Sequence, residues 1–360
     1  MKLIALILAL APLSALAAEP VRAFFGSRTV VKEQHMVPRL GSDDGYGEKY
    51  TFNADFPGKG TFYFSLTISN LGMGDHNMEA KGRLTLGEQK FAWNKKLDDD
   101  EWKHSKSPFS ITAGPASLSG TPEKLVMTAK AGGNEVELEF TPIGRAWRPK
   151  NGQVQFGKDR NVSDFTVFPL MKVTGRYKIG GDWQPLEGRG FGSHTWSDTA
   201  VYEQTRFSRE FRGIQGDYTV YMRELIPAAE FESAPIHYLL VTKGPEVVIE
   251  SFTLETKATE TLTDSKHENK YKVDESFTVQ GFDDEEKARQ FRGSVTKIKQ
   301  RGRTDLLAEM NAAVKMVAER YSKPVRYDYD VGFHFEVKTP EGVETIKGED
   351  GRYEVYHWNK

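Results

Sequence analysis

A strict alternation of apolar and polar residues runs through long stretches of this chain and restricts what it can fold into. In the longest stretch every second residue is apolar or aromatic: Val325, Tyr327, Tyr329, Val331, Phe333, Phe335 and Val337. Their neighbours include Arg326, Asp328 and Glu336. Antiparallel strands typically have one apolar face and one solvent-exposed face, whereas strands of a buried parallel sheet are apolar on both faces. The pattern therefore predicts a mainly β protein with antiparallel strands.

Chain length indicates more than one domain. Shorter alternating runs occupy residues 50–56, 62–68 and 136–140. The 360 residues exceed the size at which a single hydrophobic core normally keeps growing. We therefore expect two tandem β domains, spanning residues 19–200 and 201–360.

Helical patterns are scarce. The segment Thr304–Tyr321, with Thr304 as a plausible N-cap, would place an apolar stripe along one side of a helix: Leu306, Leu307, Met310, Ala313, Val314 and Val317. A shorter helix is predicted over Asp283–Phe291. A late amphipathic helix followed by a last pair of strands suggests β-barrels with a plug or lid.

The first 18 residues have the pattern of a secretory signal peptide. Lys2 precedes an apolar run from Leu3 to Leu16, and Ala15–Ala17 offers small residues for cleavage. The run is shorter than the ~20 residues that span a membrane comfortably. We therefore expect removal of residues 1–18, export to the periplasm or beyond, and no membrane span in the mature chain.

Composition argues against several functional classes. The chain has no cysteine, which excludes disulfides, thiolate chemistry and a lipoprotein anchor. Its 49 Lys and Arg against 51 Asp and Glu give no electrostatic reason to expect nucleic-acid binding. The eight histidines never approach His-Glu-x-x-His spacing, and no phosphate loop or dinucleotide fingerprint is present. We therefore expect no metal and no cofactor.

The segment from Gly188 to Asp198 carries the strongest candidate site. Its alternate residues share one strand face: Gly188, Gly190, Gly192, His194, Trp196 and Asp198. Three positions without side chains indicate close packing against another backbone or a ligand. On a regular strand His194 and Asp198 lie ~13 Å apart, so this segment alone cannot form a nucleophilic triad. The face forms either a ligand wall or a core tryptophan beside a hydrogen-bonded histidine.

A charged segment follows at residues 206–212. Four polar residues share one of its faces: Arg206, Ser208, Glu210 and Arg212. Such a face is usually solvated, but inside a barrel it can surround the polar head of a ligand. On the following predicted strand, Tyr221 and Arg223 lie on one side. Ordinary cross-strand pairing is the alternative for both residues.

The order of these motifs resembles a two-domain lipocalin-like family. The resemblance is carried by Gly188–Trp196, by the Arg- and Phe-rich strand behind it and by the Tyr-containing strand after that. The ending from Asp305 to Glu354 is similar to the survival-factor branch. The family includes carotenoid 1,2-hydratases (hydroxyneurosporene synthases), AttH proteins, survival-factor-1-like proteins and decalin-forming cyclases. It implies two tandem lipocalin-like antiparallel β-barrels with a hydrophobic pocket in or between them.

The resemblance also implies site residues. His194 and Trp196 match a His-x-Trp pair that, in the hydratases, acts with an acid in protonating an alkene. Tyr221 matches the family's tyrosine, but Arg223 stands where the acid is expected. An arginine is far too weak an acid for this step. Hydration would therefore need another acid, for which the candidates are Asp198 and Glu224.

Three functions remain open on the sequence. The first is an exported protein that binds a lipid or isoprenoid-type ligand through five candidate contacts: His194, Trp196, Tyr221, Arg223 and Arg206. The second is a cofactor-independent hydratase or cyclase that acts on a terpenoid or polyene, with three candidate catalytic residues: Asp198, Glu224 and His194. The third is an envelope interaction protein without a small ligand. The sequence fixes no oligomeric state.

Overall fold

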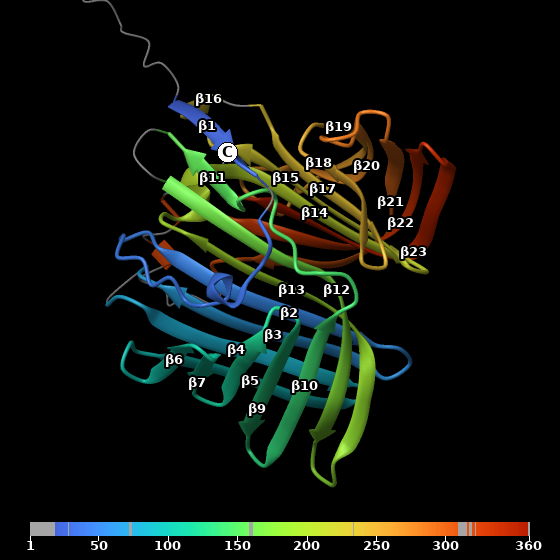
Figure 1. The fold of residues 1–360 in the computed structure, drawn as a ribbon. Helices are drawn as coiled ribbons and strands as arrows, with labels where there is room; N and C mark the ends of the chain where they lie inside the picture. The colour runs from blue at the N-terminus through green and yellow to red at the C-terminus, as the bar shows by residue number, and fades with distance from the viewer. Residues whose placement is uncertain are drawn as a thin grey trace, which may run out of the picture.

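The structure is a computed structural model that describes residues 19–27, 29–71, 74–157, 161–232, 234–308, 315–316, 319–320 and 322–358. Across these residues the chain forms two sheets, nearly all antiparallel, and each sheet curls toward a barrel (Figure 1). The prediction of a mainly β fold with two lipocalin-like barrels is confirmed. The predicted signal peptide lies outside the described residues. No helix in the described ranges has the length and apolarity to cross a membrane.

The first sheet forms most of a closed barrel. Its path runs β5-β4-β3-β2-β13-β12-β10-β9-β8-β7-β6, so β13 returns to pair with β2. The strands on this path are β2 (Gly47–Phe56), β3 (Gly60–Ser69), β4 (Asn77–Leu86), β5 (Gln89–Leu97), β6 (Trp102–Lys106), β7 (Phe109–Ala113), β8 (Ala116–Thr121), β9 (Lys124–Ala131), β10 (Asn134–Pro142), β12 (Asn161–Lys178) and β13 (Gln184–Ser197).

The second sheet repeats this plan with a shorter path. Its order is β18-β17-β15-β14-β23-β22-β21-β20-β19, and the last strand, β23, pairs with the first, β14. Its strands are β14 (Thr205–Gln215), β15 (Tyr218–Pro227), β17 (Ile236–Lys243), β18 (Glu246–Ser251), β19 (Leu254–Thr263), β20 (Lys272–Phe282), β21 (Gln290–Asp305), β22 (Val325–Thr339) and β23 (Gly342–His357).

Five short elements lie off these two paths. They are β1 (Glu19–Ala23), the 3-10 helix η1 (Glu33–His35), β11 (Gln153–Phe156), α1 (Val201–Gln204) and β16 (Phe231–Glu232). Three of them, β1, β11 and β16, belong to the first sheet. β1 pairs antiparallel with β11 and parallel with β16, so it links the two units. The division that we predicted at residue 200 falls between β13 and β14.

The interior of the N-terminal barrel is filled by its own side chains. Tyr50, Phe52 and Phe56 of β2 point inward and are almost fully buried. The glycines of β13 leave room for such rings: a Cβ on Gly192 would lie 2.3 Å from the Phe52 ring, and one on Gly188 2.2 Å from a carbonyl oxygen of β2. These positions without side chains therefore accommodate the neighbouring strand and the core rings. Of the two partners that the sequence analysis allowed, another backbone or a ligand, the structure places the backbone here.

A separate apolar cluster joins the two barrels. Phe165 and Phe191, on the outer faces of β12 and β13, pack with Tyr221 and Tyr238 of β15 and β17. These strands are therefore buried on both faces. This third cluster packs between the two barrels, each of which has its own core.

Both helix predictions need correction. Thr304 is not an N-cap, because it pairs with Arg326 near the end of β21. Residues 315–316 are helical, and the Glu319 amide donates to the Lys315 carbonyl at 2.8 Å; residues 309–314, 317–318 and 321 of the predicted helix lie outside the described residues. The segment Asp283–Phe291 forms turns that lead into β21.

Candidate functional site

A cavity of about 710 Å³ lies at the end of the N-terminal barrel where β2 begins and β13 ends. Seven of its lining residues come from the segment before β2, between residues 32 and 39. We call residues 32–40, which include η1, the strap. His194 and Trp196 of β13 also line the cavity. The two residues that the sequence analysis singled out first therefore lie in one hollow.

His194 is held through both ring nitrogens. Nδ1 lies 2.6 Å from the carbonyl oxygen of His35, and Nε2 lies 2.6 Å from Oε1 of Glu48. Its ring stacks on Tyr50, with centroids 4.0 Å apart and planes 7° apart. When Glu48 is ionised, both ring nitrogens face acceptors, so the imidazole carries two protons and forms a buried ion pair.

Glu48 is only 1% exposed. Burial alone would raise the pKa of its carboxyl, but the hydrogen bond and charge of His194, with a hydrogen bond from Tyr46, lower the pKa below its usual value. The Arg39 amide adds a hydrogen bond at 3.0 Å. Glu48 is therefore a carboxylate, which supports a charged His194.

The same buried cluster anchors the strap. The His194 ring donates to the backbone of His35, the Tyr50 hydroxyl donates to the Met36 carbonyl at 2.7 Å, and Glu48 accepts from the strap's amide at Arg39. Met36 is itself buried in the barrel core. His194 is thus a positioning residue that fixes one wall of the cavity, and both its nitrogens are already occupied.

The indole of Trp196 lies beside a pair of charged side chains, Arg39 and Asp198. The Arg39 guanidinium lies over the indole, 3.9 Å from the ring centroid. Arg39 Nη2 also lies 3.6 Å from Oδ1 of Asp198. Burial raises the pKa of the Asp198 carboxyl, and the charge of Arg39 opposes this rise.

A second buried ion pair lines the cavity. Arg148 binds Asp164 in bidentate fashion, with Nη1 and Nη2 each 2.6 Å from a carboxylate oxygen. Arg148 also donates to Thr166 and to the Asn151 carbonyl. Such pairs are rigid and directional. Asp164 therefore neutralises Arg148 and holds it in place.

Glu224 lies far from this cavity in sequence and in the fold, inside the C-terminal barrel. Arg209 Nε donates to its carboxylate, and His237 Nε2 lies 3.3 Å from Oε1. Burial would raise the pKa of Glu224, but His237 and Arg209 together lower it to about 2. Glu224 is therefore ionised at neutral pH and cannot act as a proton donor there.

Tyr221 and Arg223 lie in the contact between the barrels. The Tyr221 ring stacks against Phe191 at 5.7 Å, and its hydroxyl donates to Glu210 at 3.1 Å. The Arg223 guanidinium lies 5.2 Å from the Phe165 ring centroid. Both side chains are therefore engaged in the joint between the two units.

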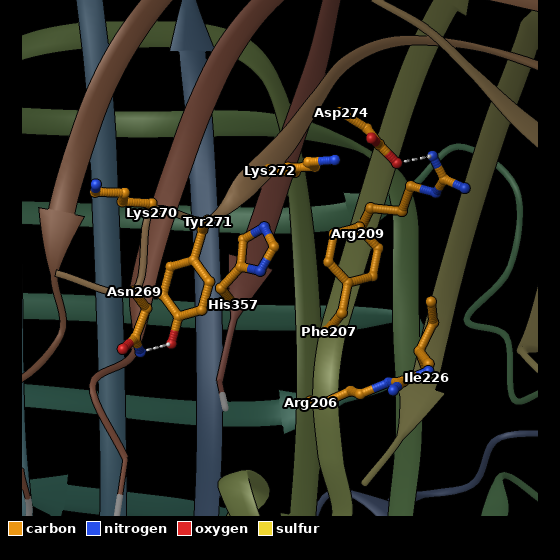
Figure 2. A pocket seen from close by; sticks show the side chains of 10 residues that line it. All are labelled: Arg206, Phe207, Arg209, Ile226, Asn269, Lys270, Tyr271, Lys272, Asp274 and His357. Atoms are coloured by element: carbon orange, nitrogen blue, oxygen red, sulfur yellow. Dashed lines mark hydrogen bonds and ion pairs between the residues drawn. The ribbon is translucent and has the colours of Figure 1, made fainter. Parts of the chain in front are cut away.

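The structure thus separates the predicted site residues into three places. The N-terminal cavity brings together His194, Trp196 and, beside them, Asp198. The joint between the barrels holds Tyr221 and Arg223. The C-terminal barrel holds the remaining two: Glu224 in its interior and Arg206 at its mouth, where it lines a further cavity (Figure 2).

Sequence reasoning missed five residues of the N-terminal site: His35, Arg39, Glu48, Arg148 and Asp164. Glu48 had a readable signal, because extending the alternation back from Tyr50 places a carboxylate on the apolar face of β2. The strap residues had no such signal, because an irregular segment has no periodic pattern of apolar residues. Nowhere in the described ranges do three or more His, Cys, Asp or Glu residues gather as a metal site would require.

Comparison with solved structures identifies the class of fold. CghA with Sch210972 superposes with a TM-score of 0.61 at 9% identity, covering 93% of this chain and 94% of that one. A putative AttH from Nitrosomonas europaea gives 0.56 at 11% identity, over 90% and 96%. Kievitone hydratase from Nectria haematococca gives 0.51 at 10% identity, over 94% and 98%. No protein-family model and no curated protein matches the chain by sequence.

The chain therefore has the two-barrel, lipocalin-like fold that these structures share. At about one identical residue in ten the likeness shows the fold alone. Membership of a particular branch, whether hydratase, AttH or survival-factor, stays a prediction from the sequence.

Proposed function

We propose that this is an exported binding protein that holds a lipid or isoprenoid-type ligand with an anionic head in the N-terminal cavity. The observation that carries the proposal is a cavity of about 710 Å³ in which an indole and several cations line one hollow. This volume falls within the ~300–1,000 Å³ typical of small-molecule sites. CghA, a protein of the same fold, has been solved with Sch210972.

The charge of the lining favours an anionic head. Besides His194, whose charge is paired with Glu48, four cationic side chains line the cavity: Lys32, Arg39, Lys106 and Arg148. Two acids line it: Glu33 and Asp164. Arg148 is neutralised by its buried partner, whereas Arg39 is half exposed and only loosely paired, 3.6 Å from Asp198. A carboxylate or phosphate would gain more from this lining than a neutral group.

The apolar part of the ligand would pack against Trp196. Val37 and Pro38 of the strap add further apolar surface to the same lining. Burying roughly 80 Å² of indole at ~25 cal/mol per Å² corresponds to about 2 kcal/mol, or roughly a 30-fold change in Kd. Trp196 therefore contributes a large share of the expected affinity.

The experiment starts with organic-solvent extraction of the purified mature protein and mass spectrometry of the extract. Palmitate and all-trans-retinoate then serve as probes in fluorescence titrations. We expect Trp196→Ala to weaken probe binding by roughly 30-fold. The control Trp183→Ala removes an indole that stacks with Arg176 outside the cavity and should leave binding unchanged. Equal binding by both variants, or no binding by the wild type, would contradict the proposal.

A cofactor-independent hydratase or cyclase is the second candidate, and one observation favours it. Asp198 is the only predicted acid whose pKa is raised, and it lies beside Trp196 through the shared contact with Arg39. A neutral carboxyl next to an apolar ligand could donate a proton. Turnover of a polyene such as neurosporene that is lost in Asp198→Asn, with ligand binding retained, would identify this activity; its absence in the wild type would remove the candidate.

A further inference from the structure

The last strand of each barrel carries a histidine near its end, His194 in β13 and His357 in β23. In the N-terminal barrel His194 pairs with Tyr50 across β13 and β2. In the C-terminal barrel His357 pairs with Phe207 across β23 and β14. Both histidines lie on inward faces, and each contacts the ring of its partner. The two mouths can therefore be compared position by position.

The covering of the two mouths is different. The chain between β1 and β2, residues 24–46, is long enough to place the strap over the N-terminal mouth. Only residues 198–204 separate β13 from β14, and α1 occupies part of them. The C-terminal mouth also holds a cavity, of about 480 Å³, and no residue of the strap lines it. The described residues of the second barrel thus offer no counterpart of the strap as a wall of this cavity.

One side of this cavity is aromatic. The rings of Tyr271 and His357 stack with centroids 4.4 Å apart and planes 16° apart. The Phe207 ring meets His357 edge-on at 5.2 Å. Figure 2 shows the three rings in a row. A flat apolar group could lie against them, because aromatic surfaces stack well on one another.

His357 has an unused polar atom. The residue is 9% exposed, and its Nε2 has no hydrogen-bond partner among the residues that the structure describes. Burial lowers the pKa of this imidazole to about 4, so the ring is neutral at neutral pH. At the equivalent position Nδ1 of His194 donates to a carbonyl oxygen of the strap. A neutral imidazole carries a single N–H, so Nε2 of His357 donates to an acceptor oxygen of a ligand when the ring is in its Nε2–H tautomer.

The rim of the cavity is cationic. Arg206, Lys270 and Lys272 line it and are exposed. Among the described residues that line the cavity, Asp274 is the one acid, and it lies 3.5 Å from Arg209. The three exposed cations form no ion pair within the described ranges. The rim therefore attracts anions.

We propose that the mouth of the C-terminal barrel is a second binding site, for an organic anion with a flat apolar body such as an aromatic carboxylate. The body would lie against Tyr271, His357 and Phe207, and the carboxylate would lie among the rim cations and accept from His357. This site is separate from the N-terminal cavity and requires nothing of it.

Calorimetric titration of the mature protein with 1-naphthoate tests the proposal. We expect binding that falls at least tenfold in Arg206→Glu/Lys272→Glu. The control Lys338→Glu/Lys347→Glu reverses two exposed charges elsewhere on the same barrel and should bind like the wild type. The neutral analogue 1-naphthalenemethanol should bind at least tenfold more weakly. Competition by inorganic phosphate at the same concentration would overturn the proposal, because it would show a simple anion site.

A second measurement locates the bound probe. In protein labelled with 15N-histidine, the ring signals of His357 are assigned by their loss in His357→Gln. We expect 1-naphthoate to shift these signals and to leave those of His194 unchanged. Binding that leaves His357 unchanged, or equal affinity in Arg206→Glu/Lys272→Glu, would overturn the proposal. Circular dichroism of each variant confirms that the fold is retained.

Discussion

The N-terminal and C-terminal barrels share one strand order, in which the last strand returns to pair with the first. They differ in how the polar and charged side chains at the mouth are paired. In the first barrel Glu48 and His194 neutralise each other and hold the strap. In the second barrel Arg209 pairs with Glu224, and Nε2 of His357 at the mouth has no hydrogen-bond partner among the described residues.

The length of the segment before the first strand explains this difference. A long segment can fold back and offer its carbonyl groups to the histidine at the end of the last strand. A short one cannot. Among the residues that the structure describes, the same architecture therefore yields a cavity walled by the strap in one barrel and a cavity without such a wall in the other.

The largest expected effect comes from breaking the mouth of the first barrel. His194→Leu leaves Glu48 as a buried unpaired charge, which should lower the free energy of unfolding by about 3–5 kcal/mol. Urea denaturation followed by circular dichroism measures the loss.

The matched variant in the second barrel is His357→Leu. It removes a group with an unpaired nitrogen, so we expect a loss of no more than about 1 kcal/mol. Similar losses in His194→Leu and His357→Leu would break the comparison between the two mouths.

The next effect concerns the stability of the fold at low pH. The folded-state pKa of His357, about 4, lies below the usual 6.5, so above pH 6.5 the ring is neutral in both the folded and the unfolded chain. As the pH falls from 6.5 toward 4, the unfolded chain protonates this ring and the folded chain does not, which lowers the free energy of unfolding by up to about 3 kcal/mol. Urea midpoints at pH 7 and 4.5 should show a smaller acid loss in His357→Gln than in the wild type. The exposed His334→Gln is the control and should behave like the wild type.

A smaller effect tests how tightly the first barrel is filled. A Cβ on Gly192 would lie 2.3 Å from the Phe52 ring, so Gly192→Ala should cost about 1–3 kcal/mol through overpacking. In the second barrel a Cβ on Gly332 meets nothing nearer than 3.7 Å, and Gly332→Ala should be close to neutral. Thermal unfolding of both variants measures the difference; a tolerated Gly192→Ala would show that the first interior can expand.

The smallest effect lies at the edge of the strap. Arg39→Gln removes a half-exposed cation–π contact and should cost less than about 1 kcal/mol. Because Arg39 lowers the pKa of Asp198, the same variant should raise that pKa further. Carboxyl 13C NMR measures the change. Arg176→Gln, which removes a similar stacking contact on Trp183, should leave the Asp198 titration unchanged.

The alternation of residues was enough to predict the strands and their faces. The run from Val325 to Val337 forms most of β22, with its apolar residues buried. Prediction was wrong where a strand lost its period. β21 continues to Asp305, but register shifts near Lys297 and Gln300 interrupt the alternation and made Thr304 look like a helix start.

Local hydrogen bonds explain the other wrong helix. The segment after Asp283 is rich in helix-forming residues, yet the Asp283 carboxylate accepts from the amides of Glu285 and Glu286 and closes a turn. For the site, His194 and Trp196 were found because they lie on a strand. Their partners from the strap were not, since contacts across more than a hundred residues leave no mark in either segment alone.

The strand β1 carries a consequence for anyone who divides this protein. It lies between β11 of one barrel and β16 from the other half of the chain. If the chain is divided within residues 198–204 and the two halves are separated, a strand edge and the aromatic surface around Phe191 become exposed. Exposed strand edges and exposed apolar patches promote aggregation. Separately produced halves should therefore precipitate, and co-expressed halves should reassemble into a soluble whole.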